Sequence, residues 1–228
     1  MHISAGEHDF LQMSDGEILS DFRNERYAAL NQIRWAHFLS MEIDLEGRTV
    51  FEPGAGVGDQ TDWLLNRGAK MIYVNDGRFQ NLSIIRDRFK DEARLTFLPG
   101  NLEVCLTGCE FKLNVDFIFC YGVYYHLRET PDFRIMRELS NVGQTIVFDY
   151  LVGNNDEVSY GYDNPSTSLS WYAFRPRTET LIKALKEIWG YAYLPKMQLQ
   201  WVDPLQAEQR LVAVASRAPL LNDKLERQ

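Results

Sequence analysis

Short runs of apolar residues recur between residues 45 and 150 and are separated by polar or amphipathic stretches. Each run has the length of a buried strand, and the runs lie at residues 49–51, 70–74, 95–98, 115–120 and 145–149. Apolar residues at helical spacing fill parts of the intervening stretches, at residues 59–66, 79–89 and 131–139. Strands that alternate with helices are typical of right-handed βαβ units around a parallel sheet. The pattern therefore predicts a doubly wound α/β domain.

The N-terminal segment has a weaker pattern. Residues 1–20 mix glycine, serine, aspartate and histidine without a clear period, and we expect a loose arm that orders over a ligand. An imperfect helical stripe covers residues 21–39, for which Asp21 is the expected N-cap. We predict one helix here, packed ahead of the first strand.

The C-terminal third begins with residues 153–170, whose Asn, Asp, Ser, Gly and Tyr content predicts a loop insertion. A helix is expected at 178–188, followed by strands at 193–199 and 210–215. From Pro219 onward the sequence predicts a polar tail.

These patterns suggest three parts of the chain. Residues 1–44 form an arm and helix that would serve as a lid, and residues 45–217 form the main domain, with an insertion at 153–175. Residues 218–228 form the tail.

The composition favours a single domain with a well-formed core and disfavours one class of partner. The chain has 228 residues, of which 45% are hydrophobic. Its net charge of −8 would repel a phosphate backbone, which disfavours a nucleic acid partner. Arg23, Arg26 and Arg34 cluster near the N-terminus, and we interpret them as a solvated helix face, with a local basic patch as the alternative.

Cysteine usage and hydropathy indicate the compartment. Cys105, Cys109 and Cys120 are too few and too unevenly spaced for a disulfide framework, and no Cys or His pair has zinc-site spacing, so we expect no metal. The N-terminus has no cationic start followed by an apolar region, and no run of eighteen apolar residues occurs. We expect a cytoplasmic protein that does not contact a membrane.

The segment V-F-E-P-G-A-G-V-G at residues 50–58 carries the clearest chemical signal. An apolar strand ends in Glu52 and leads into Gly54, Gly56 and Gly58. Residues without a Cβ let the main chain turn sharply and approach a ligand at the N-terminus of the next helix. A dinucleotide fingerprint would place its third glycine at Asp59, so the spacing disfavours NAD or FAD. A plain strand-to-helix turn is the alternative.

With a carboxylate two residues before the first glycine, this segment resembles motif I of the class I S-adenosylmethionine-dependent methyltransferases. In that family the carboxylate and the glycine loop face the amino acid end of the cofactor. The helix and two strands expected after residue 178 resemble the C-terminal end of the same fold, which implies a mostly parallel sheet closed by an antiparallel hairpin. The resemblance covers about residues 45–215.

The next two strand ends extend the resemblance. Asp76, in N-D-G, lies at the carboxyl edge of the second strand, where a carboxylate can accept hydrogen bonds from both ribose hydroxyls. In L-P-G-N-L-E, Asn101 and Leu102 match the family residues that meet the adenine amino group and pack on its ring. Family members often carry Asp in place of Asn101, although the amide oxygen can still accept a hydrogen bond. Ordinary turns are the alternative for both segments.

The segment D-F-I-F-C-Y-G-V-Y-Y-H-L at residues 116–127 is the second strong signal. It resembles motif IV and the following G-V-x-Y-H-L stretch of small-molecule methyltransferases. The tetrad C-Y-G-V stands where enzymes acting on adenine nitrogens or glutamine amides carry D/N-P-P-Y/F, which excludes those relatives. His126 could act as a general base for a substrate hydroxyl or could donate a structural hydrogen bond. Trp171, Tyr172 and Arg175 follow the insertion and could wall an acceptor pocket or belong to the core.

The resemblance implies a transferase that moves a methyl group from S-adenosylmethionine to an oxygen or nitrogen of a small-molecule acceptor. The candidate catalytic residues are Tyr121, Tyr125 and His126. The candidate cofactor-binding residues are Glu52, Gly54, Ala55, Gly56, Gly58, Thr61, Asp76, Gly77, Asn101, Leu102, Cys120, Tyr121 and Gly122. A peptide or RNA acceptor, a non-catalytic cofactor-binding module and an NAD-dependent oxidoreductase are the alternatives. The sequence leaves the oligomeric state open.

Overall fold

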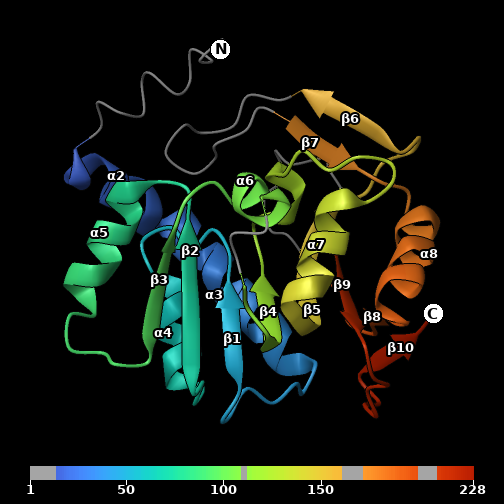
Figure 1. Cartoon of the computed structure of the whole chain (residues 1–228), viewed down its shortest axis with the longest axis horizontal. Coiled ribbons are helices and arrows are strands. Elements are labelled where there is room, and N and C mark those ends of the chain that lie inside the picture. Colours follow the sequence, from blue (N-terminus) through green and yellow to red (C-terminus); the bar gives the residue numbers. More distant parts are fainter. Residues whose placement is uncertain (1–13, 109–111, 161–171, 200–209) are drawn as a thin grey trace.

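The computed structural model describes residues 14–108, 112–160, 172–199 and 210–228. Its centre is an eight-stranded sheet in the order β10-β8-β9-β5-β4-β1-β2-β3 (Figure 1). The strands are β1 (Thr49–Glu52), β2 (Met71–Asp76), β3 (Leu95–Pro99), β4 (Val115–Cys120), β5 (Gly143–Leu151), β8 (Tyr191–Pro195), β9 (Arg210–Ser216) and β10 (Leu225–Arg227).

The five strands predicted first pair in parallel, and the C-terminal strands pair antiparallel. β1 pairs with β2 and β4, β2 with β3, and β4 with β5, all parallel. β9 runs antiparallel to β5 and also pairs antiparallel with β8. The predicted doubly wound, mostly parallel sheet with a C-terminal antiparallel hairpin is confirmed.

Helices cover both faces of the sheet, which explains the uninterrupted apolar runs of its central strands. Along β4, Phe117 and Phe119 face a core shared with α3 (Glu25–Ser40), α4 (Asp59–Asn66) and α5 (Phe79–Arg88). Ile118 and Cys120 face the opposite core, shared with α6 (Leu102–Thr107), α7 (Arg134–Val142) and α8 (Thr178–Trp189). Figure 1 shows α7 in front of the sheet and α3 behind it.

The N-terminal segment contains two helices where one was predicted. α2 (Asp15–Arg23) begins after Ser14, whose side chain forms a capping box with Glu17. α3 begins after Asn24, whose side-chain oxygen accepts the Tyr27 N–H at 2.8 Å. Asp21 is therefore not an N-cap, because it lies inside α2, and the part of the expected loose arm from residue 15 onward is helical.

The insertion and the tail also contain strands that the sequence did not indicate. β6 (Glu157–Tyr160) and β7 (Tyr172–Arg175) pair antiparallel as a separate two-stranded sheet within the expected loop insertion. Trp171 lies outside the described residues. In the expected tail, β10 pairs with β8 and buries Leu225. Three residues are too few to show the alternation of a strand in the sequence, so this segment is a strand because it pairs with β8.

The helix after β4 is displaced from its predicted position. It begins at Arg134 instead of residue 131 because the Glu129 carboxylate accepts the N–H groups of Ile135 and Met136, both at 2.9 Å.

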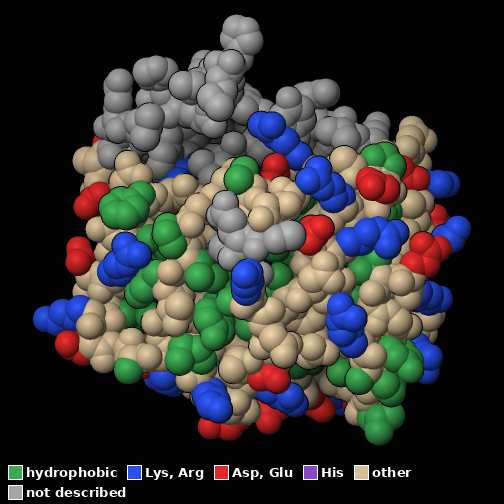
Figure 2. Space-filling model, viewed as in Figure 1, with side chains coloured by type: hydrophobic (Ala, Val, Ile, Leu, Met, Phe, Trp, Pro, Cys, Tyr) green, Lys and Arg blue, Asp and Glu red, His purple; other side chains and the backbone are tan. Residues whose placement is uncertain are grey.

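Over the described ranges, no helix combines the length and the apolar character that crossing a membrane requires. On the face shown in Figure 2, Lys and Arg side chains are interspersed with Asp and Glu and form no patch of one sign.

Candidate functional site

A cavity of about 300 Å³ lies at the carboxyl ends of β1, β2 and β4. This is the edge at which doubly wound sheets bind their ligands. Predicted site residues that line the cavity are Gly54, Ala55, Gly56, Asp76, Gly77, Asn101, Leu102, Tyr121, Gly122 and His126. The other predicted site residues are buried outside this lining and are Glu52, Gly58, Thr61, Cys120 and Tyr125.

The glycine turn needs glycine for conformation and for space. Gly54 and Gly56 have φ angles of 62° and 59°, a region that other residues rarely adopt. A Cβ on Gly54 would lie 2.7 Å from a methyl group of Val123, and one on Gly56 would lie 2.6 Å from the ring of Phe22. The main chain at Gly56 is therefore in close contact with α2, and at Gly54 with the turn after β4.

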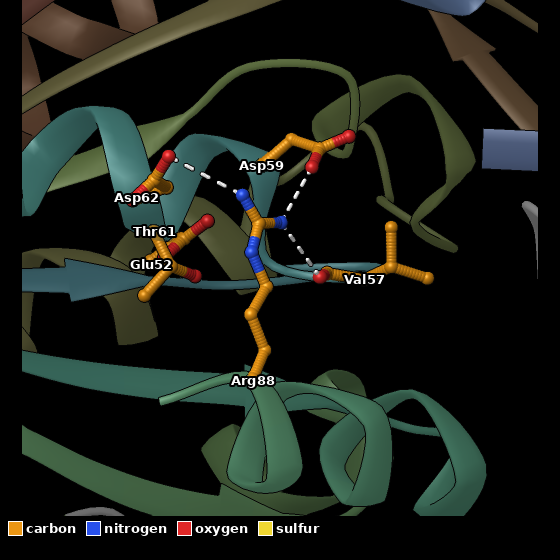
Figure 3. Close-up of polar contacts among 6 residues, drawn as sticks. All are labelled: Glu52, Val57, Asp59, Thr61, Asp62 and Arg88. Atoms are coloured by element: carbon orange, nitrogen blue, oxygen red, sulfur yellow. Dashed lines mark hydrogen bonds and ion pairs between the residues drawn. The ribbon is translucent and has the colours of Figure 1, made fainter. Parts of the chain in front are cut away.

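The start of α4 is fixed by a guanidinium from the neighbouring helix. Arg88 of α5 pairs with Asp59 at 2.6 Å and Asp62 at 3.3 Å, and donates to the carbonyl oxygen of Val57 at 3.3 Å (Figure 3). These contacts hold the last residues of the glycine turn against α5. The sequence did not indicate this role for Arg88.

Glu52 is buried beneath the turn and carries an unusual pKa. Its Oε2 accepts the hydroxyl of Thr61 at 2.7 Å, and its Oε1 has no hydrogen-bond partner within the described ranges. The pKa of Glu52 is raised to about 8, chiefly by burial. The hydrogen bond from Thr61 lowers this pKa, and the nearby charges of Asp76 and Asp59 add to the increase. The carboxyl group therefore retains its proton at neutral pH.

Asp76 joins the end of β2 to the glycine turn. Its Oδ2 accepts the Gly56 N–H at 2.9 Å, and its Oδ1 accepts the Arg78 N–H at 2.8 Å and the Asn81 amide at 3.1 Å. Burial raises the pKa of Asp76, while these hydrogen bonds act in the opposite direction. One buried carboxylate thus sets both the shape of the turn and the wall next to it.

The end of β3 forms the opposite wall. Asn101 is the N-cap of α6, and its side-chain oxygen accepts the Val104 N–H at 3.2 Å. Leu102 presents an apolar surface to the cavity and is itself 7% exposed. Asn75 donates to the carbonyl oxygens of Leu98 and Gly100, which fixes the chain between β3 and α6.

The aromatic turn after β4 completes the cavity. The Gly122 N–H donates to Oδ1 of Asp149 at 2.6 Å. The hydroxyl of Tyr125 accepts from Nη1 of Arg210 at 2.8 Å, and the guanidinium lies 4.1 Å from the centre of the Tyr125 ring. Burial raises the pKa of Cys120, so this thiol stays protonated. Tyr125 thus connects β9 to the turn, whereas His126 borders the cavity itself.

The sequence predicted a lid in residues 1–44 but did not indicate which of its residues line the cavity. Phe22 of α2 and Tyr27 and Asn31 of α3 line the cavity. Arg34 is 3% exposed, so its interpretation as part of a solvated face is wrong; a Cβ on Gly122 would lie 2.6 Å from its guanidinium. Further lining residues that the sequence did not indicate are Val57, Asp59, Gln60, Asn75, Arg78, Asn81, Glu103, Val104 and Arg128.

His37 of α3 is not part of the cavity lining but contacts the turn after β4. Its Nδ1 lies 3.0 Å from the hydroxyl of Tyr121, and its Nε2 lies 2.9 Å from the carbonyl oxygen of Met197. Asn31, Arg34 and His37 follow one another at a spacing of three residues on α3 and are all buried. The polar row at helical spacing is visible in the sequence, but the same pattern is typical of an exposed helix face, so it does not indicate a buried cluster.

The strand order, the antiparallel closure and the glycine turn after β1 define the fold of the class I S-adenosylmethionine-dependent methyltransferases. The predicted fold class is thus confirmed. No protein-family model matches the chain, and no curated protein matches its sequence.

Solved structures with this fold share little sequence with the chain. The chain is similar to magnesium protoporphyrin IX methyltransferase (ChlM) from Synechocystis PCC 6803 with bound S-adenosylmethionine, at 13% identity and a TM-score of 0.63, covering 94% of this chain and 99% of that one. It is similar to the N-terminal domain of EvdMO1, solved in the presence of S-adenosylhomocysteine and D-fucose, at 16% identity and a TM-score of 0.61, covering 85% and 84%. A third is 1,6-didemethyltoxoflavin-N1-methyltransferase from Burkholderia thailandensis, at 14% identity and a TM-score of 0.59, covering 96% and 92%.

Proposed function

We propose that this protein is an S-adenosylmethionine-dependent methyltransferase that acts on an oxygen or nitrogen atom of a small-molecule acceptor. One observation carries the proposal. The glycine turn after β1 forms a wall of a cavity at the carboxyl edge of a class I methyltransferase sheet. Similar structures hold S-adenosylmethionine or S-adenosylhomocysteine.

The chemistry of the cavity fits such a cofactor. Gln60, Asn75 and Asn81 line it, and each has a buried side-chain oxygen with no hydrogen-bond partner among the described residues. Buried oxygens of this kind are usually satisfied, so they favour a ligand that donates several hydrogen bonds. Leu102 offers an apolar surface for a flat ring. Amino, hydroxyl and adenine groups of the cofactor match this mixture.

In the proposed arrangement the ribose hydroxyls are held by Asp76, adenine by Asn101 and Leu102, and the methionine end by the glycine turn above Glu52. Residues 1–44 would act as the lid. Support for a lid comes from Phe22, which lies on Gly56 in the described part of this segment. Entry of the cofactor would then require α2 to move away from the turn.

The bound cofactor supplies a methyl group that is already activated by its sulfonium. The chain must therefore hold the acceptor in line and handle its proton. Tyr121 and His126 line the cavity at the turn after β4 and are the proposed groups at this end. Tyr125 would act by holding this turn through Arg210.

A small-molecule acceptor is favoured by the similar proteins, which include methyltransferases of magnesium protoporphyrin IX and of 1,6-didemethyltoxoflavin. The net charge of −8 and the absence of a D/N-P-P-Y/F tetrad also favour it. We further propose a cytoplasmic location, since the buried Cys120 is a free thiol.

The test is methyl transfer into a cell extract. Purified protein and methyl-labelled S-adenosylmethionine are added to the small-molecule, protein and RNA fractions separately. We expect label in the small-molecule fraction only, and inhibition by S-adenosylhomocysteine. Label confined to protein or RNA would overturn the acceptor class, and binding without any label would indicate a non-catalytic module.

A further inference from the structure

The Tyr121 hydroxyl has a defined hydrogen-bond direction, which follows from the two partners of His37. The carbonyl oxygen of Met197 can only accept, so Nε2 of His37, at 2.9 Å, must carry the proton. Burial lowers the pKa of His37, which favours the neutral imidazole. Nδ1 of the neutral ring is then an acceptor, and the hydroxyl of Tyr121, at 3.0 Å, donates to it. The lone pairs of the Tyr121 oxygen remain available to accept a second proton.

Tyr121 borders the part of the cavity in which the acceptor is proposed to bind. It lines the cavity together with Gly122 and Asn31. It is 3% exposed, and burial followed by the nearby Asp149 raises its pKa well above the ordinary range. A phenol in this state does not ionise alone at neutral pH. The Tyr121 oxygen can accept a proton from a substrate only if the hydroxyl proton leaves at the same time. Nδ1 of His37, to which the hydroxyl donates, can receive that proton.

The surroundings of His37 suit a cation that forms transiently. Asp149 of β5 raises the pKa of His37, against the larger effect of burial, and therefore stabilises the protonated ring. Arg34, one turn earlier on α3, lowers the pKa of Tyr121, and Tyr121 and the Met197 carbonyl are the hydrogen-bond partners of His37. His37 is thus neutral at rest and has a carboxylate close by when it gains a proton.

We propose that Tyr121 and His37 form a proton-accepting pair for methyl transfer, in which His37 acts only through the Tyr121 hydroxyl. The proposal rests on the proposed function. As the acceptor oxygen or nitrogen bonds to the methyl carbon, the sulfur–methyl bond breaks and its electron pair stays on sulfur. The acceptor proton passes to the Tyr121 oxygen, and the Tyr121 proton passes to Nδ1 of His37. After product release the proton returns through Tyr121 to water in the cavity.

The resting arrangement is tested without any reaction. Nitrogen-15 NMR of histidine-labelled protein with bound S-adenosylhomocysteine should show His37 as the neutral ring with its proton on Nε2. Tyr121→Phe should shift the Nδ1 resonance, because it removes the hydroxyl donor and retains the ring. A His37 ring protonated on Nδ1, or unaffected by Tyr121→Phe, would overturn the proposal.

The proton step is tested with His37→Asn, whose amide oxygen can still accept from Tyr121 but cannot take a proton. We expect label transfer to the small-molecule fraction to fall about 100-fold in both His37→Asn and Tyr121→Phe, and no further in the double variant. Affinity for S-adenosylhomocysteine should stay within about threefold. The wild type should lose rate as the pH falls below the pKa of His37, and His37→Asn should not show this loss.

Ser40→Ala is the matched control, because it removes a hydrogen bond from Ser40 to the His37 carbonyl oxygen on the same helix. It should leave label transfer unchanged. A His37→Asn variant within about threefold of wild-type turnover would refute the pair and leave the proposed function standing. A wild-type protein that transfers no label to any fraction would instead refute the proposed function, and the pair with it.

Discussion

Replacing Glu52 with glutamine should make the protein more stable at neutral and alkaline pH. The pKa of Glu52 rises from its ordinary value of 4.5 to about 8, chiefly through burial. Because the folded-state pKa is the higher one, the folded protein binds more protons than the unfolded chain between these values. The stability contributed by protonated Glu52 is therefore complete below pH 4.5 and is lost as the pH rises towards 8.

The size of the stability difference follows from the interval between the ordinary pKa of Glu52 and its raised value. Each pH unit between the two values corresponds to about 1.4 kcal/mol, so the whole interval amounts to about 5 kcal/mol. Glutamine has no charge to bury, and its side-chain oxygen can still accept from Thr61. We expect Glu52→Gln and wild type to have similar unfolding free energies at pH 5, and the advantage of the variant to grow by about 1.4 kcal/mol per pH unit up to pH 8.

Urea unfolding of both proteins at pH 5, 6, 7 and 8 measures this difference. Thr61→Val provides a second comparison, because loss of the hydroxyl donor would raise the pKa of Glu52 further and extend the pH-dependent loss of stability above pH 8. A difference between Glu52→Gln and wild type that stays constant across this pH range would refute the reasoning.

Three further substitutions test the architecture of the site. Gly56→Ala should abolish S-adenosylhomocysteine binding measured by calorimetry, since its Cβ would meet Phe22 at 2.6 Å, whereas Gly47→Ala, which shares a positive φ but has no atom within 4 Å, should lose stability by strain and retain binding. Asp76→Asn should weaken that binding at least about tenfold, because an amide cannot reproduce all three hydrogen bonds that the carboxylate accepts, and an unchanged affinity would contradict this role. Glu129→Ala should lower the unfolding free energy in urea by about 3 kcal/mol, since it leaves buried N–H groups at the start of α7 without their acceptor, and a loss below about 1 kcal/mol would count against this account.

The central strands of the sheet, β1, β4 and β5, could be predicted from the sequence because they are buried on both faces. Such strands appear as uninterrupted apolar runs, and β4 is the clearest of them. The turn at Gly54 and Gly56 could also be predicted, because its positive φ angles disfavour residues other than glycine. Local chemistry determines both features, so both are visible in one sequence.

Features that depend on distant partners were missed. β10 is a strand only because β8 lies beside it, and α7 begins where Glu129 caps it. The polar row on α3 that includes His37 has the composition of an exposed helix face. Within this row, His37 is buried and forms a hydrogen bond with Tyr121, 84 residues later in the chain. Pairings between separate elements leave no periodic signal in the residues that make them.

The central claim is that the cavity beside the glycine turn binds S-adenosylmethionine. Titration calorimetry of the wild-type protein with S-adenosylhomocysteine tests it most directly. The structure predicts one site per chain with a dissociation constant in the micromolar range, lost in Gly56→Ala and retained in Gly47→Ala. No heat of binding at a protein concentration of about 100 μM, or equal binding by Gly56→Ala and wild type, would contradict the claim.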